Sequence, residues 1–176
     1  ASFGSVAIAV SPLGVMAGDG GNLRGANWTA GGLTPLGVLR EGVRTWAEGL
    51  NDFTSVGFTS YANDRTQATQ WNLAGQPTLL TGLANTQHSR AYGINQAGQV
   101  VGWNGGEQFV DNFSRAVIWN QGQVSPLYTP GYASSTARDI NEHGEVAGSA
   151  YTVNTRPEHA VVWNTDGSLR TLETPV

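Results

Sequence analysis

Short apolar stretches alternate with polar positions along the whole chain, with a period near two rather than 3.6 residues. In residues 91–102, AYGINQAGQVVG, two such stretches flank a Gln-Ala-Gly turn, where glycine supplies the positive φ that a tight hairpin needs. In residues 116–127, AVIWNQGQVSPL, a second pair flanks a Gln-Gly turn. Residues 37–50 come closest to a helical period, but Gly42 and Gly49 interrupt it, so we expect a connector and a strand with at most a short helical turn. The pattern predicts a series of β-hairpins.

Both hairpin motifs recur along the chain. The first reads Ala-x-x-aliphatic, usually Asn, a short turn and a V-x-G or V-G ending, and it begins at Ala7, Ala47, Ala91 and Ala137. The second places a Trp before a glycine turn, at Trp28, Trp71, Trp119 and Trp163; its first copy, from Ala26, is one residue shorter. Because two independent markers share one period, they predict four repeats of about 44 residues, at approximately 5–43, 44–88, 89–134 and 135–176. These repeats make up a single repeat domain over residues 1–176.

Four short strands per repeat are typical of a β-propeller blade. One small sheet cannot bury both of its faces, so each repeat is expected to pack against its neighbours, with the repeated Trp between blades and the repeated Ala where strands crowd. We therefore predict an all-β, β-propeller-like fold of four-stranded antiparallel sheets. Four blades could close a small ring. No strand is evident for joining the first blade to the last, which favours the alternative, an open β-repeat array completed by other chains.

Composition narrows the range of partners. The 176 residues are 39% apolar and only 12% charged, with 24 glycines, which suits a turn-rich β fold and not a coiled coil or a charged disordered tail. The net charge is −4 and no Lys is present, so the basic surface that binds nucleic acid is missing. No apolar run is long enough for a membrane helix, and we expect no membrane insertion. The absence of Cys excludes disulfides and thiolate chemistry.

The repeated motifs resemble the bacterial extracellular HAF repeat family, in which an Ala-x-x-Ile-Asn-x-x-Gly-x-Val-x-Gly segment precedes a His-Ala-Phe-x-Trp segment. Residues 159–163, His-Ala-Val-Val-Trp, match with Val for Phe, and residues 115–119, Arg-Ala-Val-Ile-Trp, match with Arg for His. The resemblance covers nearly the whole chain, is strongest in the third and fourth repeats and weakens toward the N-terminus. It implies a β-repeat fold and a secreted or cell-surface location in bacteria. It implies no established activity.

Candidate chemistry is sparse. The three histidines, His88, His143 and His159, form no HExxH or His-x-His pattern, and no G-x-S-x-G elbow occurs. The segment from Asp139 to Glu145 is similar to part of a calcium loop but lacks its second acidic position and its twelfth-position Glu; a turn-forming Asn explains it better. We therefore predict no catalytic residue, no metal site and no cofactor. A glycoside hydrolase using loop carboxylates stays a distant alternative.

A recurring Asn–Arg pair offers the best candidate contact site. Four loops between the two hairpins of a repeat contain it: Asn22 and Arg24, Asn63 and Arg65, Asn112 and Arg115, and Asn154 and Arg156. If the blades are related by rotation, these groups would form a ring of donors at one end; capping of strand ends is the alternative role. Trp103, in a Gly-rich polar stretch, is either an exposed indole for stacking on a sugar or packed against Phe109 or Phe113.

Together these features predict a secreted, non-enzymatic β-repeat protein with a structural, adhesive or self-assembling role at the cell surface or outside the cell. Its expected partner is a further copy of itself, in a homo-oligomer or polymer. The alternative is a carbohydrate-binding, lectin-like module whose partner is a glycan.

Overall fold

The chain folds into short antiparallel sheets. The computed structural model describes residues 5–21, 24–106, 114–152 and 155–172, and within these residues it contains sixteen strands and no helix. The first two sheets consist of β1 (Val6–Val10), β2 (Met16–Asp19), β3 (Gly25–Thr29) and β4 (Gly32–Pro35), then β5 (Arg44–Leu50), β6 (Thr54–Ser60), β7 (Thr66–Asn72) and β8 (Pro77–Leu79). The last two consist of β9 (His88–Ile94), β10 (Val100–Gly105), β11 (Ser114–Asn120) and β12 (Gln123–Pro126), then β13 (Ser134–Ile140), β14 (Val146–Thr152), β15 (Thr155–Trp163) and β16 (Leu169–Leu172).

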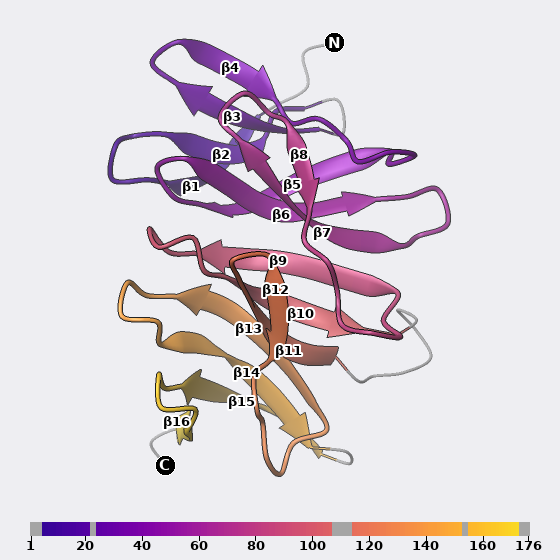
Figure 1. Ribbon diagram of the computed structural model, residues 1–176, viewed down its shortest axis with the longest axis vertical. Coiled ribbons are helices and arrows are strands. Elements are labelled where there is room, and N and C mark those ends of the chain that lie inside the picture. Colours follow the sequence, from indigo (N-terminus) through magenta and orange to yellow (C-terminus); the bar gives the residue numbers. More distant parts are fainter. Residues whose placement is uncertain (1–4, 22–23, 107–113, 153–154, 173–176) are drawn as a thin grey trace.

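Each sheet keeps its four strands in chain order, and all neighbouring strands pair antiparallel. The four sheets stack one on another from the N-terminal to the C-terminal end (Figure 1). The first strand of each later sheet packs against the preceding sheet, β5 on β2, β9 on β6 and β13 on β10. The predicted four-stranded antiparallel sheets are thus confirmed, and residues 37–50 form a connector followed by β5, as expected. The first and fourth sheets lie at opposite ends of the stack.

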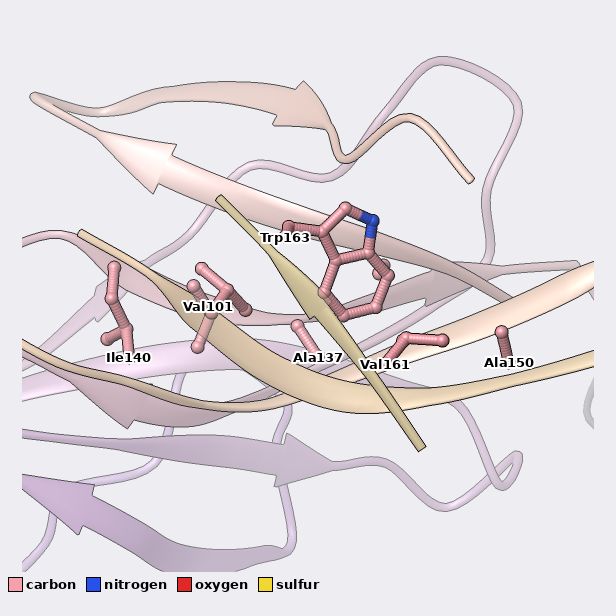
Figure 2. Close-up of a cluster of buried hydrophobic side chains, with 8 residues drawn as sticks. Val101, Ala137, Ile140, Ala150, Val161 and Trp163 are labelled. Atoms are coloured by element: carbon pink, nitrogen blue, oxygen red, sulfur yellow. The ribbon is translucent and has the colours of Figure 1, made fainter. Parts of the chain in front are cut away.

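The repeated indoles fill the space between sheets. Trp71, Trp119 and Trp163 are at most 2% exposed, and each side chain packs toward the preceding sheet. Their Nε1 groups donate to the carbonyl oxygens of Gly37 (2.7 Å), Thr81 (2.8 Å) and Tyr128 (3.1 Å), each in the connector that enters the Trp's own sheet. Figure 2 shows the last interface, where Trp163 lies over Val101, Ala137 and Val161. The predicted position of the indoles is confirmed at three sites, whereas Trp28 is partly exposed because no sheet precedes its own.

A bulge explains the glycine that closes each first motif. In the third sheet the register of β9 and β10 shifts beside Gly102, which pairs with Ala91. A Cβ at position 102 would lie 1.9 Å from the carbonyl oxygen of Arg90, closer than any real contact. Only glycine allows the two strands to approach this closely.

One detail of the repeat alignment is wrong. The backbone amides of Ala68 and Ala116 donate to hydroxyls in the first strand of the next sheet, and in the first repeat it is Gly25, not Ala26, that makes this bond. The pairing of Trp28 with Met16 keeps the indole in its repeat position. Gly25 therefore takes the place of the repeated Ala, three residues before its Trp as in the other repeats, and the motif is not shorter in the first repeat.

Candidate interaction surfaces: two end faces and an aromatic groove

The N-terminal end of the stack exposes positions that are buried or half-buried in the later sheets. Ala7 is exposed, whereas the matching Ala47, Ala91 and Ala137 are at most 1% exposed. Val10 is 67% exposed, whereas Leu50, which matches it, is 9% exposed. The cross-strand register continues this apolar surface through Met16, Trp28 and Leu33. We call Ala7, Val10, Met16, Trp28 and Leu33 the N-terminal face.

The C-terminal end of the stack exposes the opposite side of the repeated interface. Ala147, Ala160 and Leu172 form the C-terminal face and are exposed. Their matches in the earlier sheets are buried: Val56 and Val101 for Ala147, Ala68 and Ala116 for Ala160, and Leu36 and Leu80 for Leu172. Inside the molecule these are the side chains against which the next sheet packs. Each end of the stack thus presents one half of the interface that is repeated three times within it.

Hydroxyl groups fix how successive sheets meet. The amides of Gly25, Ala68 and Ala116 donate to Thr45 Oγ1 (3.0 Å), Ser89 Oγ (2.8 Å) and Ser135 Oγ (3.1 Å), each two residues before a repeated Ala. The hydroxyl at the same distance before Ala7 belongs to Ser5, which is exposed. The amide that matches the three donors is that of Ala160. The N-terminal end therefore presents a further hydroxyl acceptor of this series, and the C-terminal end presents a further amide donor.

The turn asparagines form a second series. The Oδ1 atoms of Asn51, Asn95 and Asn141 accept backbone amides of their own turns, which is the turn-forming role expected from the sequence. In addition, Nδ2 of Asn51 donates to the carbonyl oxygen of Asn95 (2.9 Å), and Nδ2 of Asn95 donates to that of Asn141 (3.2 Å). Nδ2 of Asn141 donates to the Glu145 carboxylate instead (2.7 Å). The series stops at the C-terminal sheet.

A groove of about 650 Å³ opens beside the second and third sheets. Its walls include Arg44, Trp46 and Glu48 from β5 and Arg90 from β9. Phe58, also in the wall, stacks on Trp46 with ring centroids 4.8 Å apart and planes 15° apart, and the Arg90 guanidinium lies 4.2 Å from the Phe58 centroid. These contacts hold an aromatic pair and a guanidinium in fixed positions along the groove.

The groove carries charged side chains of both signs, and the Glu48 carboxyl among them is partly buried. Burial raises the pKa of the Glu48 carboxyl, and the charges of Arg90 and Arg138 oppose that shift. Arg138 lies over the ring of Tyr92 at 4.8 Å. Arginines, aromatic rings and one carboxyl thus continue from the groove toward the fourth sheet.

Trp103 is half-buried in β10, and its Nε1 donates to the Tyr92 hydroxyl at 3.2 Å. Phe109 and Phe113, its other proposed neighbours, lie outside the described residues. Trp103 therefore contacts Tyr92 of its own sheet, and it pairs across the strands with Arg90 of the groove wall.

The predicted Asn–Arg pairs do not all lie in loops: Arg24, Asn63 and Arg65 lie in connections between strands, whereas Arg115 and Arg156 lie in β11 and β15. Arg24, Arg65 and Arg115 are exposed, and within the described part of the chain none of them forms an ion pair. Asn63 Oδ1 accepts the Arg65 amide at 3.4 Å, a capping contact inside the pair. Asn22, Asn112 and Asn154 lie outside the described residues, as does the side chain of Arg156. Only the second pair, Asn63 and Arg65, is therefore described in full, and the first, third and fourth pairs stay a prediction.

Sequence reasoning missed Trp46, Phe58 and Arg90 as a group. The signal that could have found them is the variability of the residues on either side of each repeated Ala. Around Ala47 these are Trp46 and Glu48, and around Ala91 they are Arg90 and Tyr92. Positions that change from repeat to repeat while their neighbours do not are candidates for binding.

Within the described residues, no three His, Cys, Asp or Glu side chains gather in a way that could hold a metal ion. No helix there has the length and apolar character needed to cross a membrane.

Comparison with known proteins defines the fold and nothing further. No protein-family model and no curated protein matches the chain. It is similar to the putative TolB from Agrobacterium tumefaciens, with a TM-score of 0.66, 11% identity and coverage of 92% of this chain and 62% of that one. It is also similar to TolB from Acinetobacter baumannii, with a TM-score of 0.64, 12% identity and coverage of 97% and 43%. The chain spans less than two thirds of either protein. Its fold is an all-β, β-propeller-like stack of four blades.

Proposed function

We propose that this protein is a secreted, non-enzymatic structural module that assembles head to tail, the C-terminal face of one copy covering the N-terminal face of the next. One observation carries the proposal: repeat positions that are buried or half-buried at the internal interfaces are exposed at the two ends. An apolar sheet face of this kind is usually covered in a functional protein. Because each end carries one half of the internal interface, a second copy of this chain supplies the matching half.

The internal interfaces indicate how two copies would meet. Ala68 and Ala91 belong to one buried cluster, and Ala116 and Ala137 belong to the next. The matching pair across the new interface is Ala160 of one copy with Ala7 of the other. Ser5 would then accept the Ala160 amide, as Ser89 and Ser135 accept the corresponding amides inside the chain.

The number of copies follows from ring size. Head-to-tail interfaces give a closed ring when the rotation closes and a filament when it does not. Propellers generally contain about four to eight blades. One chain does not close, because its first and fourth sheets lie at opposite ends of the stack. Two copies would supply eight blades, so a closed dimer is the assembly that we expect.

The secreted location and the scaffolding or adhesive role belong to the same proposal. They are supported by the resemblance of the repeats to a bacterial extracellular family. A structural role also suits a chain whose repeated residues are used for stacking.

Light scattering after size exclusion, over a range of concentrations, tests the assembly. We expect a species of twice the 18.5 kDa chain mass. Ala7→Arg places a charge on the N-terminal face, where the single chain has room for it, and should leave a folded monomer. Phe53→Arg is the matched control, because Phe53 is an exposed apolar residue in the β5–β6 turn, away from both faces. A wild-type chain that stays monomeric at all concentrations would overturn the proposal.

Cross-linking tests the geometry. The chain has no Cys, so a disulfide can form only between introduced residues. At the first internal interface a Cβ on Gly25, which matches Ala160, would lie 3.1 Å from the Ala47 amide nitrogen, so the paired positions are close enough for a disulfide. The double variant Ala7→Cys with Ala160→Cys should therefore cross-link between copies on oxidation. Ala7→Cys with Ala97→Cys, an exposed turn position, should not, and equal cross-linking of both variants would argue against a head-to-tail contact.

A further inference from the structure

We propose that the groove between β5, β6 and β9 binds a neutral oligosaccharide, with one sugar ring stacked on Trp46. The proposal is independent of head-to-tail assembly, because the groove shares no residue with either end face. It concerns a different surface from the predicted Asn–Arg pairs, although Trp103 pairs across the strands with Arg90 of the groove wall.

The stacking platform is already in place. Phe58 is buried and covers one face of the Trp46 ring, while Arg90 covers Phe58. Trp46 itself is only half-buried and lines the groove, so its second face is the one left for a ligand. A rigid indole with one face supported from behind suits the apolar C–H face of a pyranose, because stacking then requires little reordering of the side chain.

Two polar atoms of groove residues are unpaired. Within the described residues, Thr66 Oγ1 and Arg90 Nε are buried and make no hydrogen bond. A buried polar group without a partner costs about 1–3 kcal/mol. Both atoms lie beneath the surface of the wall, so the groups that a ligand meets first are the Trp46 ring and the charged side chains.

The charges select a neutral ligand. Arg44 and Arg90 supply two positive groups, and Glu48 and Asp64 supply two negative groups around the same groove. A strongly anionic chain would meet the carboxylates, and a cationic one would meet the guanidinium groups. Vicinal hydroxyls can donate to carboxylates and accept from guanidinium groups at once, so they can use both signs of charge. Asp64 has a φ of 62°, a left-handed conformation within the β6–β7 turn, where its amide donates to the Tyr61 carbonyl oxygen at 3.1 Å.

Titration with a panel of neutral hexasaccharides tests the site. The panel would contain cello-, malto-, manno- and N-acetylchitohexaose, with oligogalacturonate as the anionic comparison, followed by calorimetry and tryptophan fluorescence. We expect at least one neutral sugar to bind with a Kd of about 1 mM or tighter, and Trp46→Ala to weaken binding at least about 10-fold. Because Trp46→Ala removes a stacked ring and could loosen the fold, Asp64→Asn is the second variant. Asp64 is exposed, so its replacement should lower the affinity about 3-fold or more without changing stability.

Phe53→Ala is the matched control, since it removes an exposed aromatic ring far from the groove and should leave the affinity unchanged. Three outcomes would overturn the proposal: no neutral sugar binds, only the anionic oligosaccharide binds, or the affinity is the same in the Trp46→Ala and Asp64→Asn variants as in the wild type. Failure here leaves the light-scattering result untouched, so the two proposals can be judged separately.

Discussion

The same residue type in the same repeat position should contribute very differently to stability at the end and in the middle of the stack. Trp71 is fully buried, packs among Val15, Ala17 and Leu36, and donates to the Gly37 carbonyl at 2.7 Å. Trp28 has the same cross-strand register but is partly exposed. Replacing each by alanine therefore measures what a neighbouring sheet adds to one indole.

The magnitudes follow from burial. Trp71→Ala removes a large side chain from a closed site, which costs about 3–5 kcal/mol, and leaves the Gly37 carbonyl without its donor, which adds about 1 kcal/mol. Trp28→Ala removes a ring that packs only on its own sheet, and we expect a cost of about 1–2 kcal/mol. The two variants should differ by about 2–5 kcal/mol in the free energy of unfolding.

Guanidinium unfolding followed by circular dichroism measures this difference. Both variants should be made in the Ala7→Arg protein, because assembly would bury Trp28 and reduce the difference in stability between them. The denaturant slope should be similar in both variants, so that the midpoints report stability. Equal destabilisation by Trp28→Ala and Trp71→Ala would refute the view that stacking on a preceding sheet supplies most of the stability of the repeated indole.

Four further variants test other parts of the fold. Asn95→Ala should lower the free energy of unfolding by about 2 kcal/mol and Asn141→Ala by less than about 1 kcal/mol, because only Asn95 bonds to a following turn; thermal unfolding would measure both. Gly102→Ala should cost more than about 3 kcal/mol, since its Cβ meets a carbonyl oxygen, and a wild-type melting temperature would contradict this. Burial raises the pKa of Glu48 above 4.5, so ionisation destabilises the folded state as the pH rises past 4.5. Glu48→Gln should therefore stabilise the protein at pH 7 and lose that gain below pH 4.5, as measured by unfolding at several pH values.

The architecture could be predicted from sequence periodicity because the repeated residues form the interfaces between sheets. Trp119 and Ala91 recur at one period, and in the structure they belong to the same buried cluster. A substitution at a repeated position is harder to recognise from sequence. Gly25 takes the place of an alanine, and the hydrogen bond to Thr45 together with the pairing of Trp28 and Met16 identifies it as the equivalent residue.

The candidate surfaces are less visible in the sequence for a physical reason. The exposure of Ala7 depends on the absence of a preceding sheet, and nothing in the residue itself differs from the buried Ala47. The groove depends on Trp46 and Arg90 meeting on either side of Phe58, although they come from different repeats. Such contacts arise from stacking, and local pattern does not encode them.

Alternation along β5 separates the two proposed roles within one strand. Successive side chains of a strand point to opposite sides, and Thr45 and Ala47 are buried toward the first sheet while Trp46 and Glu48 line the groove. The residues that a neighbouring sheet requires are therefore constrained to small or hydroxyl side chains, and the residues between them are free of that constraint. A substitution at Trp46 can change binding without altering the stacking interface, and a substitution at Ala47 would do the reverse. The repeat thus permits different ligand contacts in different blades while every interface between blades keeps the same design.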